Sequence, residues 1–393
     1  MTRRELLRRA ALTGAALPLA AQQETDALLV APSEISGLQP SAALRNLRDD
    51  CITKGPWSVT YTRPTGLSEA GLHDFFSEAP YWWPDPKNPN GAYVRKDGKV
   101  NHDRFTAHDI FLARMSNAVL ALALSAALNR DAEAAARAWQ LLDVWFLQPD
   151  TYMNPNLEFG QAIRGITTGR GIGIIDTRPL IWCVQGIALL ERSLPNPRLS
   201  AGLRRWFSDY VQWLTTSSKG LDERDNGNNH STWWAAQVAA YSIFCGDKKA
   251  ELKTYELCRT RLIPGQLRPD GSAPAEEART RSLSYSIMNL DGFSLLCRLA
   301  AARGVDLWNF KTSDGAGVLT SVEYLAPFAA APSRWKKPQI TPISPARGYF
   351  LGLAGMAANR REWVELQQKT GHPGGSWGLL FDMLMTQWLT RAC

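Results

Sequence analysis

Residues that commonly bind metals are scarce in this chain, which has only 5 histidines and 6 cysteines among its 393 residues. None of the cysteines occurs in the close pairs that are typical of zinc sites. Cys183, Cys245 and Cys297 lie in apolar stretches, where a buried free thiol is common. We therefore predict no metal site and no cofactor.

Long apolar runs are also missing after residue 21, so we expect no membrane span and a soluble mature protein. Residues 2–9 are basic, and residues 10–21 form a short run of small and apolar side chains. This order is typical of an export signal, and the paired arginines followed by two leucines resemble a twin-arginine signal. A basic amphipathic first helix is the alternative. We predict a periplasmic or secreted bacterial protein, with residues 22–393 as a single catalytic domain.

Dense blocks of positive charge are absent, which argues against a nucleic-acid-binding arm. The formal net charge is +7, and residues 1–21 contribute four arginines and one glutamate to it, so the remainder carries +4. A mildly basic protein of this kind suits a polyanionic partner.

Strand-like alternation is rare, and from residue 107 onward the pattern is helical almost to the end. The segment 198–216 has one apolar stripe, whereas 233–244 is apolar nearly all round. Outer helices of the first kind around inner helices of the second kind indicate an all-α fold, an (α/α) toroid. A helical bundle or a solenoid is the alternative, although no fixed-period repeat favours a solenoid. The expected helices are 107–128, 131–148, 177–194, 198–216, 231–245, 248–262, 278–303, 317–330 and 375–391.

Aromatic residues gather in a proline-rich segment at 80–86. Because its prolines forbid a regular helix, Tyr81, Trp82 and Trp83 are expected on a rigid extended loop. Such a loop either plugs the core or offers sugar rings a surface for stacking. We predict that these three side chains bind substrate.

A second loop, 169–177, is rich in glycine and follows a segment with polar side chains. It is not a dinucleotide or phosphate loop, because the third glycine and the lysine of those motifs are absent. Gln161, Arg164 and Arg170 remain as candidate contacts for a carboxylated ligand. Ordinary surface arginines are the alternative interpretation.

The segment 226–234 places His230 between amides and indoles at the predicted start of a helix. Asn229 or Ser231 is expected to cap this helix, which would bring the imidazole to the mouth of a pocket. Asn228 and Trp234 are predicted to contact the substrate there. A capped helix with an ordinary core histidine is the alternative.

A polar cluster at 270–285 supplies arginines and a tyrosine near the start of the next helix. Arg281 and Tyr285 are four residues apart and are expected to share a helix face. A guanidinium beside a phenol favours the phenolate, so this pair is a candidate base. The structural alternative is an arginine stacked on a helical tyrosine.

Histidine, asparagine, arginine and tyrosine together suit β-elimination on a uronic acid. The C5 proton can leave only if the adjoining carboxylate is neutralised, which an amide and a guanidinium achieve by hydrogen bonding. A base must then take this proton, and an acid must protonate the departing O4.

Three segments of the chain resemble the alginate-lyase superfamily of polysaccharide lyases: 169–177 (GRGIGIIDT), 228–234 (NNHSTWW) and 277–285 (EARTRSLSY). The resemblance implies an (α/α) toroid that acts on an anionic polysaccharide. It places the catalytic residues at Asn229, His230, Arg279 and Tyr285. The spacing of arginine and tyrosine is one residue shorter than the family pattern, so Arg281 rivals Arg279 for the carboxylate.

Two further segments, 81–86 (YWWPDP) and 93–98 (YVRKDG), look more like the branch with β-1,4-glucuronan lyases than like enzymes that cut mannuronan. The resemblance therefore implies a lyase of β-1,4-linked uronate polymers, either glucuronan or mannuronan.

Two other classes of function remain open. A glycoside hydrolase on the same toroid needs two opposed carboxylic acids. The candidates for them are Asp222, Glu223, Asp225, Glu276 and Glu277. A protein that binds polysaccharide through the tryptophan loop without turnover is the second alternative.

Overall fold

The computed structural model describes residues 28–64, 69–343 and 348–391. The export signal predicted for residues 1–21 lies outside these residues. One hydrophobic cluster extends from Leu28 to Met385 and joins helices from the whole described chain.

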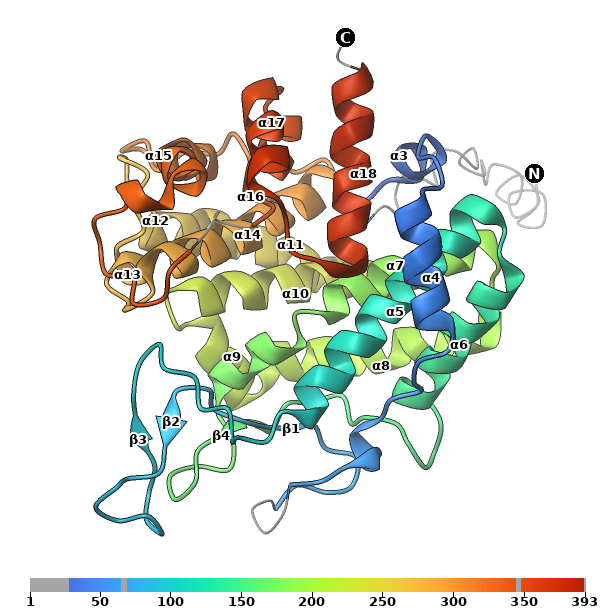
Figure 1. Cartoon of the computed structure of the whole chain (residues 1–393), viewed down its shortest axis with the longest axis horizontal. Coiled ribbons are helices and arrows are strands. Elements are labelled where there is room, and N and C mark those ends of the chain that lie inside the picture. Colours follow the sequence, from blue (N-terminus) through green and yellow to red (C-terminus); the bar gives the residue numbers. More distant parts are fainter. Residues whose placement is uncertain (1–27, 65–68, 344–347, 392–393) are drawn as a thin grey trace, which may run out of the picture.

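Six helices follow one another around the core: α5 (Ala107–Asn129), α7 (Leu180–Ser193), α10 (Asn229–Cys245), α14 (Ser282–Ala301), α16 (Phe350–Ala357) and α18 (Gly375–Arg391). Each of the first five contacts the next one, and α18 contacts both α16 and α5 (Figure 1). The last helix therefore returns to the first and closes the inner layer.

A second set of helices packs on the outside of this layer. It comprises α4 (Ala42–Ile52), α6 (Ala132–Phe146), α8 (Pro197–Thr216), α11 (Lys248–Leu257), α15 (Val318–Ala330) and α17 (Arg361–Thr370). This double layer confirms the predicted (α/α) toroid. The short helices α3 (Pro32–Ser36), α9 (Ser218–Arg224), α12 (Ile263–Gln266) and α13 (Pro274–Glu277) lie in the connections.

The predicted difference between inner and outer helices is present in the structure. In α8 the buried residues form the expected stripe, whereas α10 is buried nearly all round. Inner helices also approach closely: a side chain at Gly186 of α7 would lie only 3.2 Å from the backbone of Leu120 in α5. Glycine at this position permits the contact between the two helices.

The structure differs from the predicted helices in several places. The helix expected at 278–303 begins only at Ser282, because α13 ends at Glu277 and the intervening residues are not helical. The helix expected at 248–262 ends in a π-helical turn, Cys258–Leu262. Neither α16 nor α17 was predicted, because the first is short and rich in glycine and the second has no capping side chain at its start.

The few strands of the described residues lie together below α9 in the view of Figure 1. Strand β1 (Phe76–Glu78) pairs in parallel with β4 (Phe159–Ala162), and β2 (Trp82–Trp83) pairs antiparallel with β3 (Val94–Arg95). The aromatic segment predicted as an extended loop is therefore one side of a short hairpin.

Helix α5 has the length and hydropathy of a membrane span, although 67% of that window is buried inside the fold. Its surroundings are the helices α4, α6, α7 and α18. The apolar character of α5 thus reflects its position in the core.

The start of α16 depends on a buried carboxyl group in α14. Asp291 Oδ1 accepts the backbone N–H groups of Tyr349 at 2.8 Å and Phe350 at 3.0 Å. These are donors that the first turn of a helix leaves unpaired. Burial raises the pKa of Asp291 to about 7 despite these hydrogen bonds.

This raised pKa predicts a pH-dependent contribution to stability. The unfolded chain loses the Asp291 proton near its ordinary pKa of about 3.9, while the folded protein keeps it up to about pH 7. The free energy of unfolding should therefore fall as the pH rises between these values. Asp291→Asn keeps an oxygen for the two N–H groups and should flatten this dependence between pH 5 and 8 in denaturant titrations. Equal slopes for the two proteins would contradict the assignment.

Candidate active site

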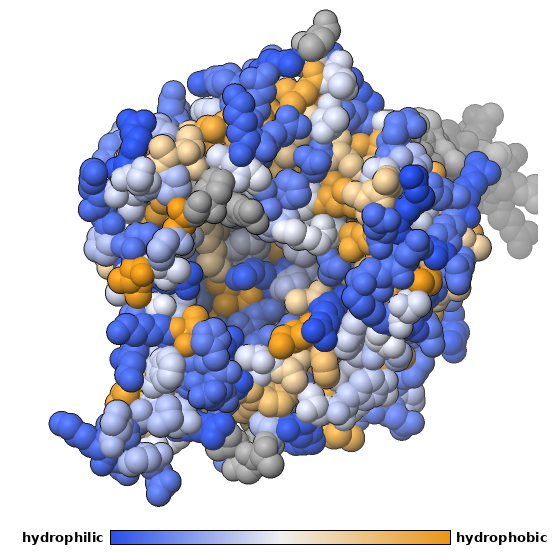
Figure 2. Space-filling view, viewed as in Figure 1, coloured by the Kyte–Doolittle hydropathy of each residue, from blue (hydrophilic) through white to orange (hydrophobic). Residues whose placement is uncertain are grey.

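A cavity of about 570 Å³ lies where the hairpin, the glycine-rich loop and the start of α10 meet. Figure 2 shows the hollow that opens over α10 on this face of the molecule, with mostly polar residues around it. The cavity is lined by Pro80, Tyr81, Trp82, Arg95, Gln161, Arg170, Ile172, Ile175, Asp176, Arg178, Asn226, Asn228, Asn229, His230, Arg279, Tyr285 and Met288.

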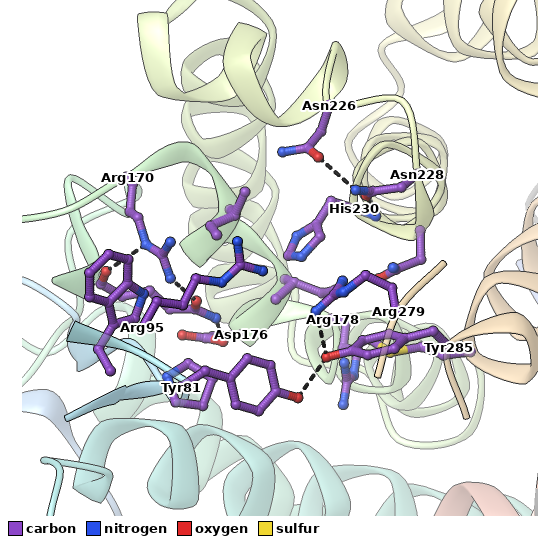
Figure 3. Close-up of a pocket in the computed structure, with 17 residues that line it drawn as sticks. Tyr81, Arg95, Arg170, Asp176, Arg178, Asn226, Asn228, His230, Arg279 and Tyr285 are labelled. Carbon is purple, nitrogen blue, oxygen red and sulfur yellow. Dashed lines mark hydrogen bonds between the residues drawn. The ribbon is translucent and has the colours of Figure 1, made fainter. Parts of the chain in front are cut away.

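Most residues predicted for the site therefore meet in one place. All four predicted catalytic residues, Asn229, His230, Arg279 and Tyr285, line the cavity (Figure 3). The predicted substrate contacts that join them are Tyr81, Trp82, Gln161, Arg170 and Asn228.

His230 is held by the first turn of α10 and by a buried carboxyl group. The helix cap is Asn228, whose side chain accepts the His230 backbone N–H at 2.9 Å, so the predicted caps Asn229 and Ser231 were wrong. The His230 Nδ1 atom lies 2.9 Å from Glu223 Oε1 in α9. A carboxyl oxygen there favours hydrogen on Nδ1 and leaves Nε2 free for proton transfer.

Glu223 is completely buried, and burial raises its pKa, while the nearby His230 opposes this shift. A buried carboxyl group requires a partner to be stable. The contact between Glu223 and His230 therefore orients the imidazole and gives one carboxyl oxygen a partner, while Glu223 Oε2 is buried without one.

Asn229 is oriented by a second buried carboxyl group, from α13. Its backbone N–H donates to Glu276 Oε1 at 2.6 Å, and its Nδ2 donates to Oε2 at 2.8 Å. The side-chain amide has a second N–H that Glu276 does not accept. Burial raises the pKa of Glu276, although both hydrogen bonds from Asn229 favour the charged form.

Arg279 and Tyr285 are in direct contact. The Arg279 Nη2 atom donates to the Tyr285 hydroxyl at 2.9 Å and to Asp97 Oδ1 at 2.8 Å. The guanidinium also lies 4.0 Å from the centre of the phenol ring. Tyr285 in turn donates its hydroxyl hydrogen to Tyr81 at 2.7 Å (Figure 3).

The expectation of a lowered tyrosine pKa was wrong. Burial raises the pKa of Tyr285, and hydrogen bonding with Tyr81 raises it further. Arg279 lowers it, but burial outweighs this attraction. At neutral pH the resting protein therefore holds a neutral phenol.

Arg281 is not the arginine beside Tyr285. It precedes the first turn of α14, and its backbone forms an isolated bridge with Gln339. Because the chain from Ala278 to Arg281 is not helical, the spacing of four residues does not place Arg281 on the tyrosine face. Arg281 does not line the cavity, so its predicted contact with substrate has no support in the structure.

Three other predicted substrate contacts also lie outside the cavity. Trp83 donates its indole N–H to the carbonyl of Lys99. Arg164 forms an ion pair with Glu78. Trp234 is buried in the core and donates to the carbonyl of Leu214.

Arg170 is held by a chain of polar side chains. Its Nε and Nη2 atoms donate to the carbonyl and side-chain oxygens of Gln161, at 3.0 and 2.9 Å. Gln161 has φ = 50°, an uncommon left-handed conformation, and donates to Asp176 at 2.8 Å. Asp176 also accepts the Ser77 hydroxyl at 2.7 Å, and burial raises its pKa. Burial lowers the pKa of Arg170 to about 10.

Several residues of this site were missed from the sequence. They are Arg95, Asp97, Asp176, Arg178 and Asn226, together with the positions taken by Glu223 and Glu276 as partners of His230 and Asn229. Asp176 and Arg178 belong to or follow the glycine-rich loop that the sequence highlighted, so that loop was the available signal.

The cavity does not offer the opposed acids of a glycoside hydrolase. Glu223 and Glu276 face His230 and Asn229, and Asp222, Asp225 and Glu277 do not line the cavity. Among the described residues the only carboxyl group lining it is that of Asp176, whose two oxygens already accept hydrogen bonds.

Across the described ranges, no group of three or more His, Cys, Asp or Glu side chains is arranged to hold a metal ion.

Comparisons with known proteins agree with this fold. The structure of an alginate lyase from Bacteroides ovatus superposes with a TM-score of 0.79 and 29% identity, over 91% of this chain and 94% of that one. Alginate lyase A1-III from Sphingomonas species A1 superposes with a TM-score of 0.55 and 16% identity, over 86% and 89% of the two chains. At this identity the second match shows the shared fold alone.

A variant of A1-III in complex with a tetrasaccharide gives a TM-score of 0.57 at 15% identity, over 86% and 89% of the chains. No curated protein matches the chain. The profile of the family described as alginate lyase matches residues 58–335, which include every residue lining the cavity. The chain therefore belongs to the alginate lyase family and is a polysaccharide lyase.

Proposed function

We propose that this lyase cleaves β-1,4-linked polyuronates, glucuronan or mannuronan, by β-elimination and leaves 4,5-unsaturated uronate ends. The observation that carries the proposal is the contact of Tyr285 with Arg279 in a cavity that also holds Asn229 and His230. The alginate lyase neighbours, two of them solved with a tetrasaccharide, support an oligosaccharide as the ligand.

Neutralisation of the substrate carboxylate is the first requirement of the reaction. Asn229 has one amide N–H that Glu276 does not use, and Arg279 has donors beyond those held by Asp97 and Tyr285. Hydrogen bonds from these groups would stabilise the negative charge that develops on the carboxylate as the C5 proton leaves.

Proton transfer is the second requirement. In D-gluco and D-manno uronates the C5 hydrogen and O4 lie on the same face of the ring, so one group can serve both. We assign this double role to Tyr285: its phenolate accepts the C5 proton, and the phenol then donates it to the departing O4. His230, oriented by Glu223, would hold the substrate or act as the base for a proton on the opposite face.

Trp82 and Tyr81 line the cavity from the hairpin and offer apolar faces to a sugar ring. We infer that Trp82 stacks on the chain near the reacting unit.

The paired arginines at positions 3 and 4 also lead us to infer that the enzyme acts outside the cytoplasm, as a periplasmic or secreted protein.

Removal of the Tyr285 hydroxyl tests the proposal most directly. Tyr285→Phe should lower kcat by about a hundredfold or more, because it removes the general acid and base without changing the ring. His230→Ala should also lower kcat strongly. The rate is followed by the near-ultraviolet absorbance of the C4–C5 double bond on polyglucuronate and polymannuronate, with the exposed Tyr61→Phe as the matched control. Near-normal kcat in Tyr285→Phe would rule out the tyrosine assignment.

The raised pKa of Tyr285 predicts how the rate depends on pH. Below that pKa the phenolate fraction grows about tenfold for each pH unit. We therefore expect kcat at saturating substrate to keep rising from pH 7 to about pH 9.5, since burial places the pKa above the ordinary value of about 10. Samples returned to pH 7.5 control for inactivation. A plateau below pH 8.5 would favour His230 as the base.

Glu276 is predicted to matter through Asn229. The two carboxyl oxygens of Glu276 accept hydrogen bonds from two N–H groups of Asn229. In Glu276→Gln one of these oxygens is replaced by an NH2 group, which cannot accept a hydrogen bond, so one N–H of Asn229 loses its acceptor. We expect kcat to fall by about tenfold or more while the variant stays folded, because Asn229 loses its orientation. Glu277→Gln, which changes the neighbouring acid outside the cavity, is the control. Equal kinetics for the two variants would contradict the role of Glu276.

A further inference from the structure

The four arginines that line the cavity differ in how their charges are held. Arg279 and Arg95 both donate to Asp97, at 2.8 and 2.9 Å. Hydrogen bonding with Arg279 and Thr280 lowers the pKa of Asp97 despite its partial burial. Two of the four cations are therefore paired with a fully ionised carboxylate.

Arg170 is held differently, because its hydrogen bonds go to the neutral oxygens of Gln161. Gln161 therefore fixes the position of the Arg170 guanidinium, so this group is not free to move toward a ligand.

Arg178 is the exception among the four. Its guanidinium makes no hydrogen bond or ion pair with any residue in the ranges 28–64, 69–343 and 348–391. It lies 5.5 Å from the centre of the Trp233 ring, which is buried in the hydrophobic core. An arginine on an aromatic ring keeps all five N–H donors for a ligand.

The acids near Arg178 balance its charge only in part. Asp109, Asp176 and Asp291 all experience the Arg178 charge, and burial raises the pKa of each. At a given pH, a carboxyl group with a raised pKa carries less negative charge than an ordinary one, so it balances a nearby cation less completely. An anion entering the cavity would supply the missing charge.

Arg178 lines the same cavity as the residues assigned to the reacting carboxylate (Figure 3). If Asn229 and Arg279 hold the carboxylate of the reacting uronate, the guanidinium of Arg178 is left for the carboxylate of a neighbouring unit of the chain.

We propose that Arg178 is a specificity residue that binds the carboxylate of the uronate adjacent to the reacting unit. This inference rests on the proposed function, and it deepens it: the substrate would need carboxylates on consecutive sugars. Chains in which charged and neutral sugars alternate would bind more weakly.

The test measures binding without turnover. Calorimetric titration of Tyr285→Phe with a β-1,4-linked tetraglucuronate is compared with the same titration of Tyr285→Phe/Arg178→Gln. Loss of a charge-assisted, bidentate contact should weaken binding at least tenfold. The tetrasaccharide methyl ester, which lacks the charges, should lose less than threefold between the same two proteins.

Two further variants keep the result interpretable. Arg205→Gln, an exposed arginine on the outer helix α8, should not change either titration. Arg178→Lys retains the charge without the planar fork, so the acid should still bind more weakly than it does to the parent, by a smaller factor. If Arg178→Gln does not fold, the titrations of Tyr285→Phe/Arg178→Lys, compared with those of Tyr285→Phe, decide whether Arg178 binds the carboxylate.

The outcomes separate the two proposals. Equal losses for acid and ester, or no loss for either, would overturn the role of Arg178. Charge-dependent binding by Arg178 in an enzyme that forms no unsaturated product from any polyuronate would leave the subsite intact and overturn the proposed reaction.

Discussion

The geometry of the site depends on two buried carboxyl groups that contact residues in the first turn of α10. Glu276 accepts hydrogen bonds from the backbone N–H and the side-chain N–H of Asn229, and Glu223 Oε1 contacts His230 Nδ1. These acids come from α13 and α9, two short helices on either side of α10. A buried carboxyl group without a partner destabilises the folded protein. The two contacts are therefore maintained, and they hold α9 and α13 against the start of α10 and orient Asn229 and His230.

Charge balance in the cavity follows from this arrangement. On the hairpin side, Asp97 is ionised and holds Arg95 and Arg279. On the side of the glycine-rich loop, burial raises the pKa of Asp176 and of Asp291, which lie near Arg178. Within the described ranges, four arginines line the cavity beside the single carboxyl group of Asp176, although the whole protein is only mildly basic.

The hairpin completes the site from a distant part of the chain. Tyr81 contacts Tyr285 across 204 residues of sequence, and Asp97 contacts Arg279 across 182. These contacts join the hairpin to the start of α14, so the tyrosine hydroxyl is fixed by groups from both. Such fixed geometry is what proton transfer to and from a sugar requires.

Local patterns in the sequence determined most helices of the toroid but not α16 and α17, and they determined the inner and outer character of α10 and α8 and the segments that carry Asn229, His230, Arg279 and Tyr285. These features depend on neighbours within a few residues, which the spacing of apolar and capping residues reveals. Tertiary structure alone decided that Arg279 and not Arg281 meets Tyr285, that Trp234 is core, and that Glu223 and Glu276 serve His230 and Asn229. Pairing and burial of charges depend on segments far apart in sequence, and burial is also what raised the pKa of Tyr285 against the attraction of its arginine.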